Sequence, residues 1–263
     1  AYEYRLTDGE ISVATGEFTT AAEIALQNGS LDGWDGSSPN AATDSKFWDT
    51  SNEGAKMGGL TPTQAVTDFV HTQGGKAAKL ESGKVDLMGG IFAAASLYTG
   101  SFGSTNIWTQ TATVNFGQSF TARPIALKGF YKYTPNVINL VKNVPAGVTI
   151  VKDQTLDQCA IYIALAKKTY TIDNGNQSTF IDFKNDENII AYGELPSGAA
   201  TEGDGYVEFN IPLKYKNLTD QPTHIIVVCS SSKYGDYMTG GAGSTLYVDD
   251  LSLIYDGTPT IWE

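Results

Sequence analysis

The chain has 263 residues, 41% of them hydrophobic, which is enough to bury a substantial core and excludes extensive disorder. Only 17% of the residues are charged, whereas the 28 glycines, 14 tyrosines and 11 phenylalanines suit twisted sheets joined by tight turns rather than helical bundles. The 29 acidic and 17 basic residues give a net charge of −12, which disfavours nucleic acid and anionic lipid as partners.

Neither a membrane-spanning segment nor a signal peptide is evident. No apolar run approaches the roughly 20 residues that a spanning helix needs, and the first residues lack a basic stretch followed by an apolar one. The sequence therefore predicts a soluble protein, or the mature part of an exported one whose targeting segment or lipid anchor belongs to a fuller precursor.

The N-terminal part of the chain is irregular in pattern. Residues 1–28 are predicted to be a linker or the end of a preceding module, with 29–263 as the main domain. The apolar island Ala21–Leu26 suits either a helix or a strand. From Ser30 to about Thr72, glycine and polar residues are interrupted by single aromatic residues, which indicates long loops. Within this stretch, Thr63–Phe69 is predicted to be helical.

After Gly74, short apolar runs alternate with turn residues, a pattern typical of β-strands. About nine such runs have the length expected in a β-sandwich, so an all-β fold is predicted. The predicted strands are Ala77–Glu81, Asn106–Phe116, Ile125–Tyr133, Gln158–Lys167, Thr179–Phe183, Ile189–Glu194, Tyr206–Tyr215, His224–Ser230 and Thr245–Tyr255.

In two of these strands the residue pattern predicts which faces are buried. Apolar and polar residues alternate from Val207 to Leu213, so one face should meet the core and the other water or a ligand. His224–Ser230 is apolar on both faces, which predicts a central strand covered on both sides.

Cysteine and histidine are scarce, which limits the chemistry. Cys159 and Cys229 lie in separate apolar runs. Two interpretations remain: both are buried free thiols, or they form a disulfide between neighbouring strands. A catalytic triad or a zinc site would have to use His71 or His224.

The strand Ile125–Tyr133 carries candidate ligand-binding residues. Alternation places Lys128 and Lys132 on one face and Tyr131 on the other. Aromatic rings stack on the apolar faces of sugars, while lysine bonds to their hydroxyl groups, so such a strand suits glycan binding. The competing interpretation is that Tyr131 and Tyr133 are core residues.

A second candidate region joins the last two predicted strands. Its glycines lack the following lysine of a phosphate-binding loop. The serines Ser230–Ser232 and Asp236 could bond to one another and stiffen the loop, and this is the default interpretation. The alternative, functional interpretation is that Lys233, Tyr234 or Tyr237 contacts a sugar.

Several blocks of the sequence carry a resemblance to a known family. The sequence resembles the putative carbohydrate metabolism domain (PCMD), found in secreted or surface-anchored proteins of Gram-negative gut anaerobes. The match extends from about Ser30 to the C-terminus. The blocks are ARPIALKGFYKY (122–133), IIAYG (189–193), SSSKYGD (230–236) and GSTLYVDD (243–250), with Trp34, WDTSN (48–52) and GKAAKL (75–80) upstream.

The resemblance implies a jelly-roll β-sandwich similar to carbohydrate-binding modules, and a location at the outer-membrane surface, in the periplasm or outside the cell. It supplies no catalytic residues. Related sugar-binding jelly rolls often share a structural calcium ion between the chain start and the last strand, which here implies Asp32 and Asp249 or Asp250 as ligands. Hydrogen bonding of these aspartates to neighbouring backbone is the alternative.

The leading hypothesis is a non-catalytic glycan-binding module for uncharged polysaccharide, because a net charge of −12 disfavours polyanionic glycans. Trp34, Trp48 and Trp108 are candidates for exposed aromatic contacts, although a core position is the favoured interpretation of each. The second hypothesis is a glycoside hydrolase using a carboxylate pair drawn from Asp157, Asp182, Glu194 and Glu208. The third is a structural or adhesive sandwich without a sugar ligand.

Overall fold

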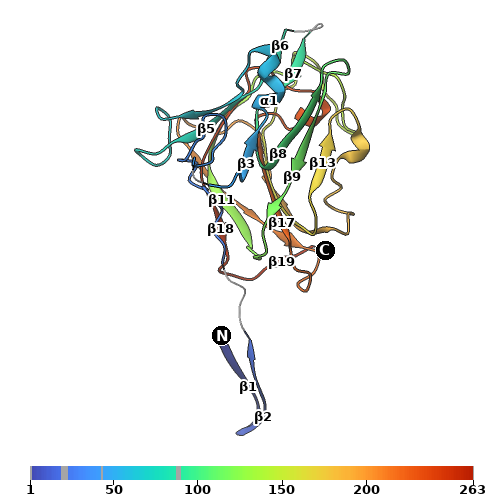
Figure 1. Ribbon diagram of the computed structural model, residues 1–263. Helices are drawn as coiled ribbons and strands as arrows, with labels where there is room; N and C mark the ends of the chain where they lie inside the picture. Colours follow the sequence, from blue (N-terminus) through green and yellow to red (C-terminus); the bar gives the residue numbers. More distant parts are fainter. Residues whose placement is uncertain (1, 19–22, 43, 87–89, 263) are drawn as a thin grey trace.

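Two mainly antiparallel β-sheets packed face to face dominate the computed structural model, which describes residues 2–18, 23–42, 44–86 and 90–262 (Figure 1). The smaller sheet has the strand order β15-β11-β18-β5-β4. Its strands are β4 (Thr63–Val66), β5 (Ala77–Glu81), β11 (Ala126–Thr134), β15 (Val207–Pro212) and β18 (Thr245–Ile254).

The larger sheet runs in the order β13-β9-β8-β17-β12-β14-β16-β19, with β3 paired to β8 and β10 paired to β17. Its strands are β3 (Trp48–Thr50), β8 (Ser96–Asn106), β9 (Thr111–Phe116), β10 (Gln118–Ser119), β12 (Ala160–Ala166), β13 (Tyr170–Asp173), β14 (Ile189–Glu194), β16 (Lys214–Tyr215), β17 (His224–Ser230) and β19 (Thr260–Ile261).

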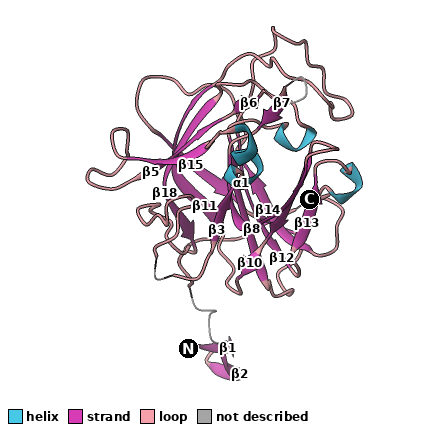
Figure 2. Cartoon of the chain, turned by 45° about the horizontal axis from the view of Figure 1, so that its top comes forward, coloured by secondary structure: helices cyan, strands magenta, loops and turns pink. Residues whose placement is uncertain are grey.

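Two short hairpins and a few helical turns complete the described chain (Figure 2). None of these helical segments has the length and hydrophobicity to cross a bilayer. In the described strand pairings, β1 and β2 pair only with each other. The hairpins are β1 (Tyr2–Asp8) with β2 (Ile11–Phe18) and β6 (Gly83–Val85) with β7 (Ile91–Ala93); the helical segments are α1 (Asn52–Ala55), η1 (Lys56–Gly58), η2 (Gln177–Thr179) and η3 (Gly235–Tyr237).

The strand order is that of a jelly roll. Following the chain through β5, β8, β11, β12, β14, β15, β17 and β18, every connection crosses to the other sheet except the one from β12 to β14. This crossing pattern produces the two interlocked Greek keys of a jelly roll. The predicted all-β jelly-roll sandwich is therefore confirmed.

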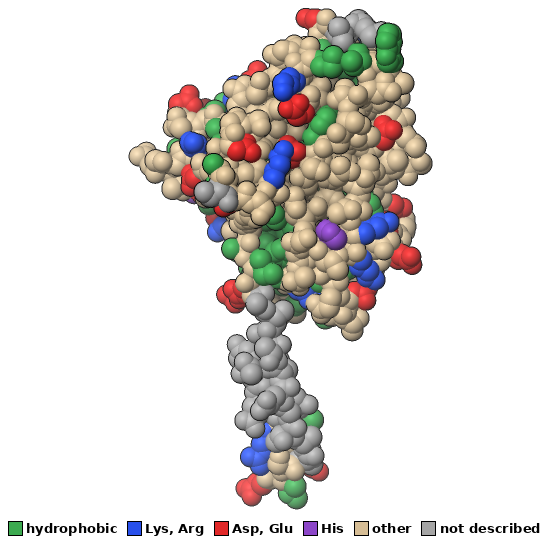
Figure 3. All heavy atoms as spheres, in the orientation of Figure 1, with side chains coloured by type: hydrophobic (Ala, Val, Ile, Leu, Met, Phe, Trp, Pro, Cys, Tyr) green, Lys and Arg blue, Asp and Glu red, His purple; other side chains and the backbone are tan. Residues whose placement is uncertain are grey.

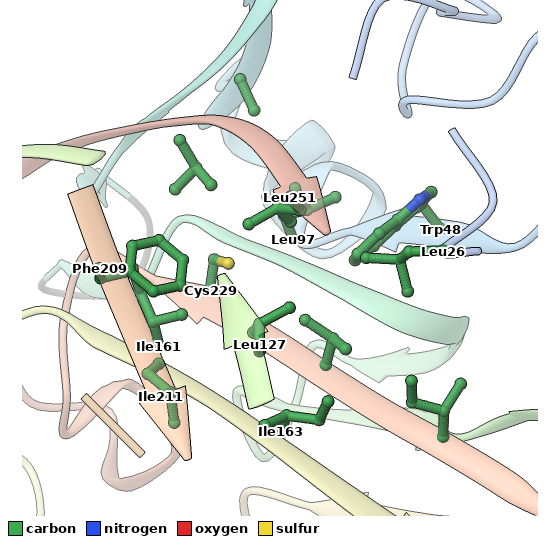
Figure 4. Packing of buried hydrophobic residues seen from close by; sticks show 14 of the residues in the cluster. Leu26, Trp48, Leu97, Leu127, Ile161, Ile163, Phe209, Ile211, Cys229 and Leu251 are labelled. Atoms are coloured by element: carbon green, nitrogen blue, oxygen red, sulfur yellow. The ribbon is translucent and has the colours of Figure 1, made fainter. Parts of the chain in front are cut away.

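The main core lies between the two sheets (Figure 4). Leu127 and Ile211 of the smaller sheet and Ile163 of the larger one are completely buried there. Cys159 and Cys229 belong to the same cluster and are free thiols. A second apolar cluster, which includes Tyr98, lies on the outer face of the larger sheet, so that sheet is packed on both sides.

Buried strands are the elements that the sequence predicts best. Ala77–Glu81 and His224–Ser230 are strands with the predicted bounds. The second of these is central in its sheet, and its residues from Ile225 to Cys229 are all buried. A strand that is apolar on both faces is stable only where other parts of the protein cover both faces. For this reason the sequence alone predicts its central position.

Three predicted elements are wrong. Thr63–Phe69 contains strand β4 instead of a helix, because pairing with β5 outweighs its local preference. Thr179–Phe183 is a turn after η2 whose aromatic residues pack on the outer cluster. The predicted strand Asn106–Phe116 is interrupted by a turn at Ile107–Gln110, which joins β8 to β9. The island Ala21–Leu26 lies partly outside the described residues, and its described part is irregular.

Candidate functional site

A pocket opens on the outer face of the larger sheet, between α1, the β6–β7 hairpin, the β8–β9 turn and η3. Figure 1 shows these elements gathered around one end of the sandwich. The cavity has a volume of about 190 Å³, far more than the roughly 10–15 Å³ that a single water needs. The pocket is therefore large enough for a small organic ligand.

The floor of the pocket is aromatic and apolar. Tyr98 comes from β8, Tyr162 from β12 and Val228 from β17, the three adjacent strands at the middle of the sheet. The outer-face side chains of neighbouring strands point the same way, so the pairing of these strands brings the three residues together. Phe92 and Phe102 add further apolar surface to the lining.

The polar groups that line the pocket are mostly neutral, and among the described residues Lys233 and Asp236 are the charged ones. Both lie where β17 gives way to η3 and so enter the pocket from one side. Asn106, Gln110 and Asn174 contribute amide groups. An apolar floor with a few convergent polar groups is the usual composition of a small-molecule site.

Asp236 is the carboxylate among the described residues that line the pocket, and its pKa is raised. Asp236 is exposed to solvent and lines the pocket. The walls of the pocket partly desolvate its carboxylate, which raises the pKa of Asp236 to about 6. Burial, with a smaller contribution from the Asp236 charge, also raises the pKa of the Tyr162 hydroxyl. A carboxyl group that titrates near neutrality in a pocket is typical of functional sites.

The outer face of the smaller sheet is different, because the loop of residues 67–75 lies across it. Phe69 stacks on Tyr206 at 4.8 Å between ring centroids and meets Tyr247 edge-on at the same distance. His71 stacks on Phe130 of β11 at 3.5 Å. The aromatic groups of this face are thus covered by the protein's own side chains.

A β-bulge in β18 holds the 67–75 loop in place. Asp250 adopts a left-handed conformation, with φ of 49°, and the register to β11 shifts at this point. Because the bulge breaks the alternation of side chains, Asp249 and Asp250 both reach the loop. Asp249 accepts a hydrogen bond from the backbone N–H of His71 at 2.7 Å, and Asp250 is 2.7 Å from the His71 ring and 2.6 Å from the Thr72 hydroxyl.

The structure separates the predicted ligand-binding residues into two groups. The three residues on β11 have partners within the protein: Lys128 forms an ion pair with Glu208 at 3.0 Å, Tyr131 packs against the core, and Lys132 donates to the carbonyl of Thr201 at 3.2 Å. Tyr133 is fully buried.

The second group lies at the pocket end of the molecule. Lys233 lines the pocket. Tyr234 precedes η3 and Tyr237 is its last residue; both are partly buried, and Tyr237 packs edge-on against Phe180 at 5.0 Å. Of the predicted binding residues, these three are the ones that share a neighbourhood with Asp236.

The four predicted catalytic carboxylates do not gather. Asp157 is 1% exposed and accepts hydrogen bonds from Ser232, Ser244 and the N–H of Gly241, so it anchors the loop after β17. Asp182 organises the turn at 182–186, and Glu194 accepts a bond from the Tyr192 hydroxyl. The described residues that line the pocket include none of the four.

The aspartates suggested as calcium ligands have local partners. Asp32 accepts a hydrogen bond from the N–H of Lys76 at 2.7 Å, and Asp249 accepts one from the N–H of Asp250 in addition to that of His71. Among the described residues, no group of three or more His, Cys, Asp or Glu side chains could hold a metal ion. Asp32 and Asp249 thus accept hydrogen bonds from backbone N–H groups, which is the arrangement that the alternative interpretation of the sequence describes.

Sequence reasoning assigned Asp236 a structural role and did not detect the pocket. The walls come from segments far apart in the chain, and only the folded topology brings α1, β6–β7 and η3 together. The one available signal was a carboxylate in the polar, glycine-rich segment that also holds Lys233.

With this geometry in place, the comparison with known families is decisive. Residues 23–254 match the family described as "Putative carbohydrate metabolism domain". The chain belongs to the PCMD family. The PCMD match begins after the β1–β2 hairpin and extends through β18. No curated protein matches the chain.

Solved structures with the same fold have also been described. A "putative glycoside hydrolase" from Bacteroides thetaiotaomicron aligns with a TM-score of 0.60 and 22% identity over 98% of this chain and 67% of its own. A "putative glycoside hydrolase" from Bacteroides vulgatus aligns with a TM-score of 0.60 and 25% identity over 81% of this chain and 88% of its own. A cellulose-specific carbohydrate-binding module has a TM-score of 0.31, 12% identity and coverages of 79% and 87%.

Proposed function

We propose that this PCMD protein binds an uncharged glycan, with one sugar unit seated in the pocket over Tyr98 and Tyr162. The observation that carries the proposal is the composition of the pocket: an aromatic floor, neutral amide groups at the wall, and Lys233 and Asp236 at one side. The apolar face of a sugar ring can lie on the floor while its hydroxyl groups bond to the polar groups. The family's description as a carbohydrate metabolism domain supports the same substrate class.

Binding fits the pocket better than two-carboxylate hydrolysis. A glycosidase places two carboxyl groups roughly 5 to 9.5 Å apart across the scissile bond, whereas Asp236 is the one carboxylate among the described pocket residues. In the binding role, the Asp236 carboxylate accepts hydrogen bonds from sugar hydroxyl groups, and Lys233 donates to a neighbouring oxygen.

Hydrolysis is the second candidate, and the pKa of Asp236 is the observation that favours it. A carboxyl with a pKa of about 6 can hold a proton in slightly acidic solution and donate it to a leaving group. The descriptions of the two Bacteroides structures as putative glycoside hydrolases also support this second candidate.

A panel of neutral gluco-, galacto-, manno- and xylo-oligosaccharides tests the proposal by titration calorimetry. Asp236→Ala and Lys233→Ala are each expected to weaken binding by about tenfold or more, because each removes a charge-assisted hydrogen bond. The matched controls Lys128→Ala and Lys132→Ala, on the other sheet, should bind like the wild type. Loss of binding in the controls but not in the pocket variants would overturn the assignment of the site, and absence of binding to every neutral sugar would overturn the function.

The same panel separates binding from hydrolysis. Release of reducing ends is measured near pH 5.5 for the wild type and for Asp236→Asn. The binding proposal expects no release from either protein. Release by the wild type that Asp236→Asn abolishes would establish the hydrolase instead.

A further inference from the structure

Trp108 stands at the rim of the pocket, at the tip of the β8–β9 turn. Its side chain is 88% exposed. Its neighbours in the turn, Ile107 and Gln110, line the pocket. Trp108 itself is not among the lining residues, so it belongs to the rim segment and not to the cavity wall.

Hydrogen bonds within the turn organise the backbone that carries Trp108. The side chain of Asn106 accepts hydrogen bonds from the backbone N–H groups of Trp108 and Thr109, at 3.0 and 3.2 Å. Gln110 adopts a left-handed conformation with φ of 56°. The backbone N–H of Gln110 donates to the carbonyl of Ile107 at 3.3 Å, which closes the turn, and the hydroxyl groups of Thr109 and Thr111 lie 2.8 Å apart. Such a turn presents a side chain at a defined place, which lowers the entropic cost of binding.

Trp108 differs from the tryptophans that stabilise the fold. Trp48 is fully buried, and its indole N–H donates to the carbonyl of Gln27 at 2.8 Å. Trp34 packs against the core and donates to the carbonyl of Leu31 at 2.7 Å. Among the described residues, the indole N–H of Trp108 has no such acceptor. A ring that is exposed in this way contributes little to folding and is available to stack on a ligand.

We infer that Trp108 is a stacking platform for a second sugar ring, joined to the one that occupies the pocket. The ligand is then an oligosaccharide of two or more neutral units, whose chain leaves the pocket over the β8–β9 turn. The apolar face of the second ring lies on the indole, and a hydroxyl group accepts the indole N–H. This inference rests on the proposed function, because it extends the same site.

The test compares a monosaccharide with the matching trisaccharide, using the best binder of the neutral panel. The wild type should bind the trisaccharide more tightly. Trp108→Ala should lower trisaccharide affinity by about tenfold and leave monosaccharide affinity unchanged. Trp108→Phe, which keeps an aromatic ring, should recover most of the loss. Because Trp108 is exposed, its fluorescence should change with the trisaccharide but not with the monosaccharide.

The outcomes distinguish this inference from the proposed function. Equal affinities of the wild type for both sugars, or unchanged trisaccharide binding in Trp108→Ala while Asp236→Ala loses it, would overturn the platform and leave the pocket intact. An equal loss for both sugars in Trp108→Ala would also overturn it, because the ring would then act on the pocket. Failure of every sugar to bind would overturn both.

Discussion

The outer faces of the two sheets carry similar aromatic groups in opposite situations. On the smaller sheet, Phe130 and Tyr206 are stacked against His71 and Phe69 of the 67–75 loop. On the larger sheet, Tyr98 and Tyr162 form the floor of an open pocket. Tyr98 and Tyr162 also have aromatic neighbours, Phe116 and Phe183, so aromatic composition alone does not locate a sugar site. The difference between the two faces is that a loop lies across one and a cavity opens on the other.

The distribution of charge follows the same division. Figure 3 shows few, scattered charged groups on the face that it displays. On β11 of the covered sheet, Lys128 and Lys132 are both bonded within the protein. In the pocket, Lys233 and Asp236 lie beside a cavity. The comparison predicts that substitutions on the covered face change stability, whereas those in the pocket change binding.

The largest stability effect is expected for Asp249→Ala, which removes the buried carboxylate that holds the 67–75 loop. The N–H groups of His71 and Asp250 would lose their acceptor, at a cost of about 3 kcal/mol. Urea denaturation measures the change. Asp68→Ala, at an exposed position of the same loop, is the matched control and should stay within about 0.5 kcal/mol. A loss of glycan binding at unchanged stability would contradict the comparison.

A smaller, pH-dependent effect is expected for Asp236→Asn. Because the pKa of Asp236 is raised to about 6 in the fold, the protonated form is favoured there, and its stabilising contribution is lost as the pH rises from about 4 through 6. The wild type should thus lose about 1 kcal/mol relative to Asp236→Asn between pH 4.5 and 7.5, allowing for the solvent that reaches the carboxylate.

The control for this pH effect has the opposite sign. Hydrogen bonds from the side chain and backbone of Asn185 lower the pKa of Asp182, so Asp182 stabilises the fold above about pH 4 and the contribution is lost in acid. Unfolding free energies of Asp236→Asn and Asp182→Asn, each compared with the wild type from about pH 3 to 7.5, measure the two effects. If the difference in unfolding free energy between Asp236→Asn and the wild type does not vary with pH, the pKa of Asp236 is not raised.

The smallest effect is expected for Lys128→Ala. Its ion pair with Glu208 is largely in solvent, and such pairs contribute about 0.5 kcal/mol or less. Thermal unfolding and the glycan titration should both resemble the wild type. Weaker glycan binding in this variant would show that the covered face takes part after all.

The sequence predicts faces within a strand well but not which face stays open. Alternation correctly placed Tyr133 and Lys128 on opposite sides of β11. The 67–75 loop that covers the Lys128 side is held by residues from β18, far along the chain, so no local pattern could reveal it. The burial of Cys159 and Cys229, in contrast, follows directly from the apolar residues around them in the sequence, and both are buried free thiols.

The position of β17 and β18 in the sheets has a consequence for how the chain folds. Each is an interior strand of its sheet, yet they are the last two long strands in the sequence. Without β18, β4–β5 and β11–β15 are separate pieces, and without β17 the same is true of β8–β9 and β12–β14. During synthesis, the sandwich can therefore assemble only after residue 254 has been made. Until then the growing chain has unpaired strand edges on both sheets.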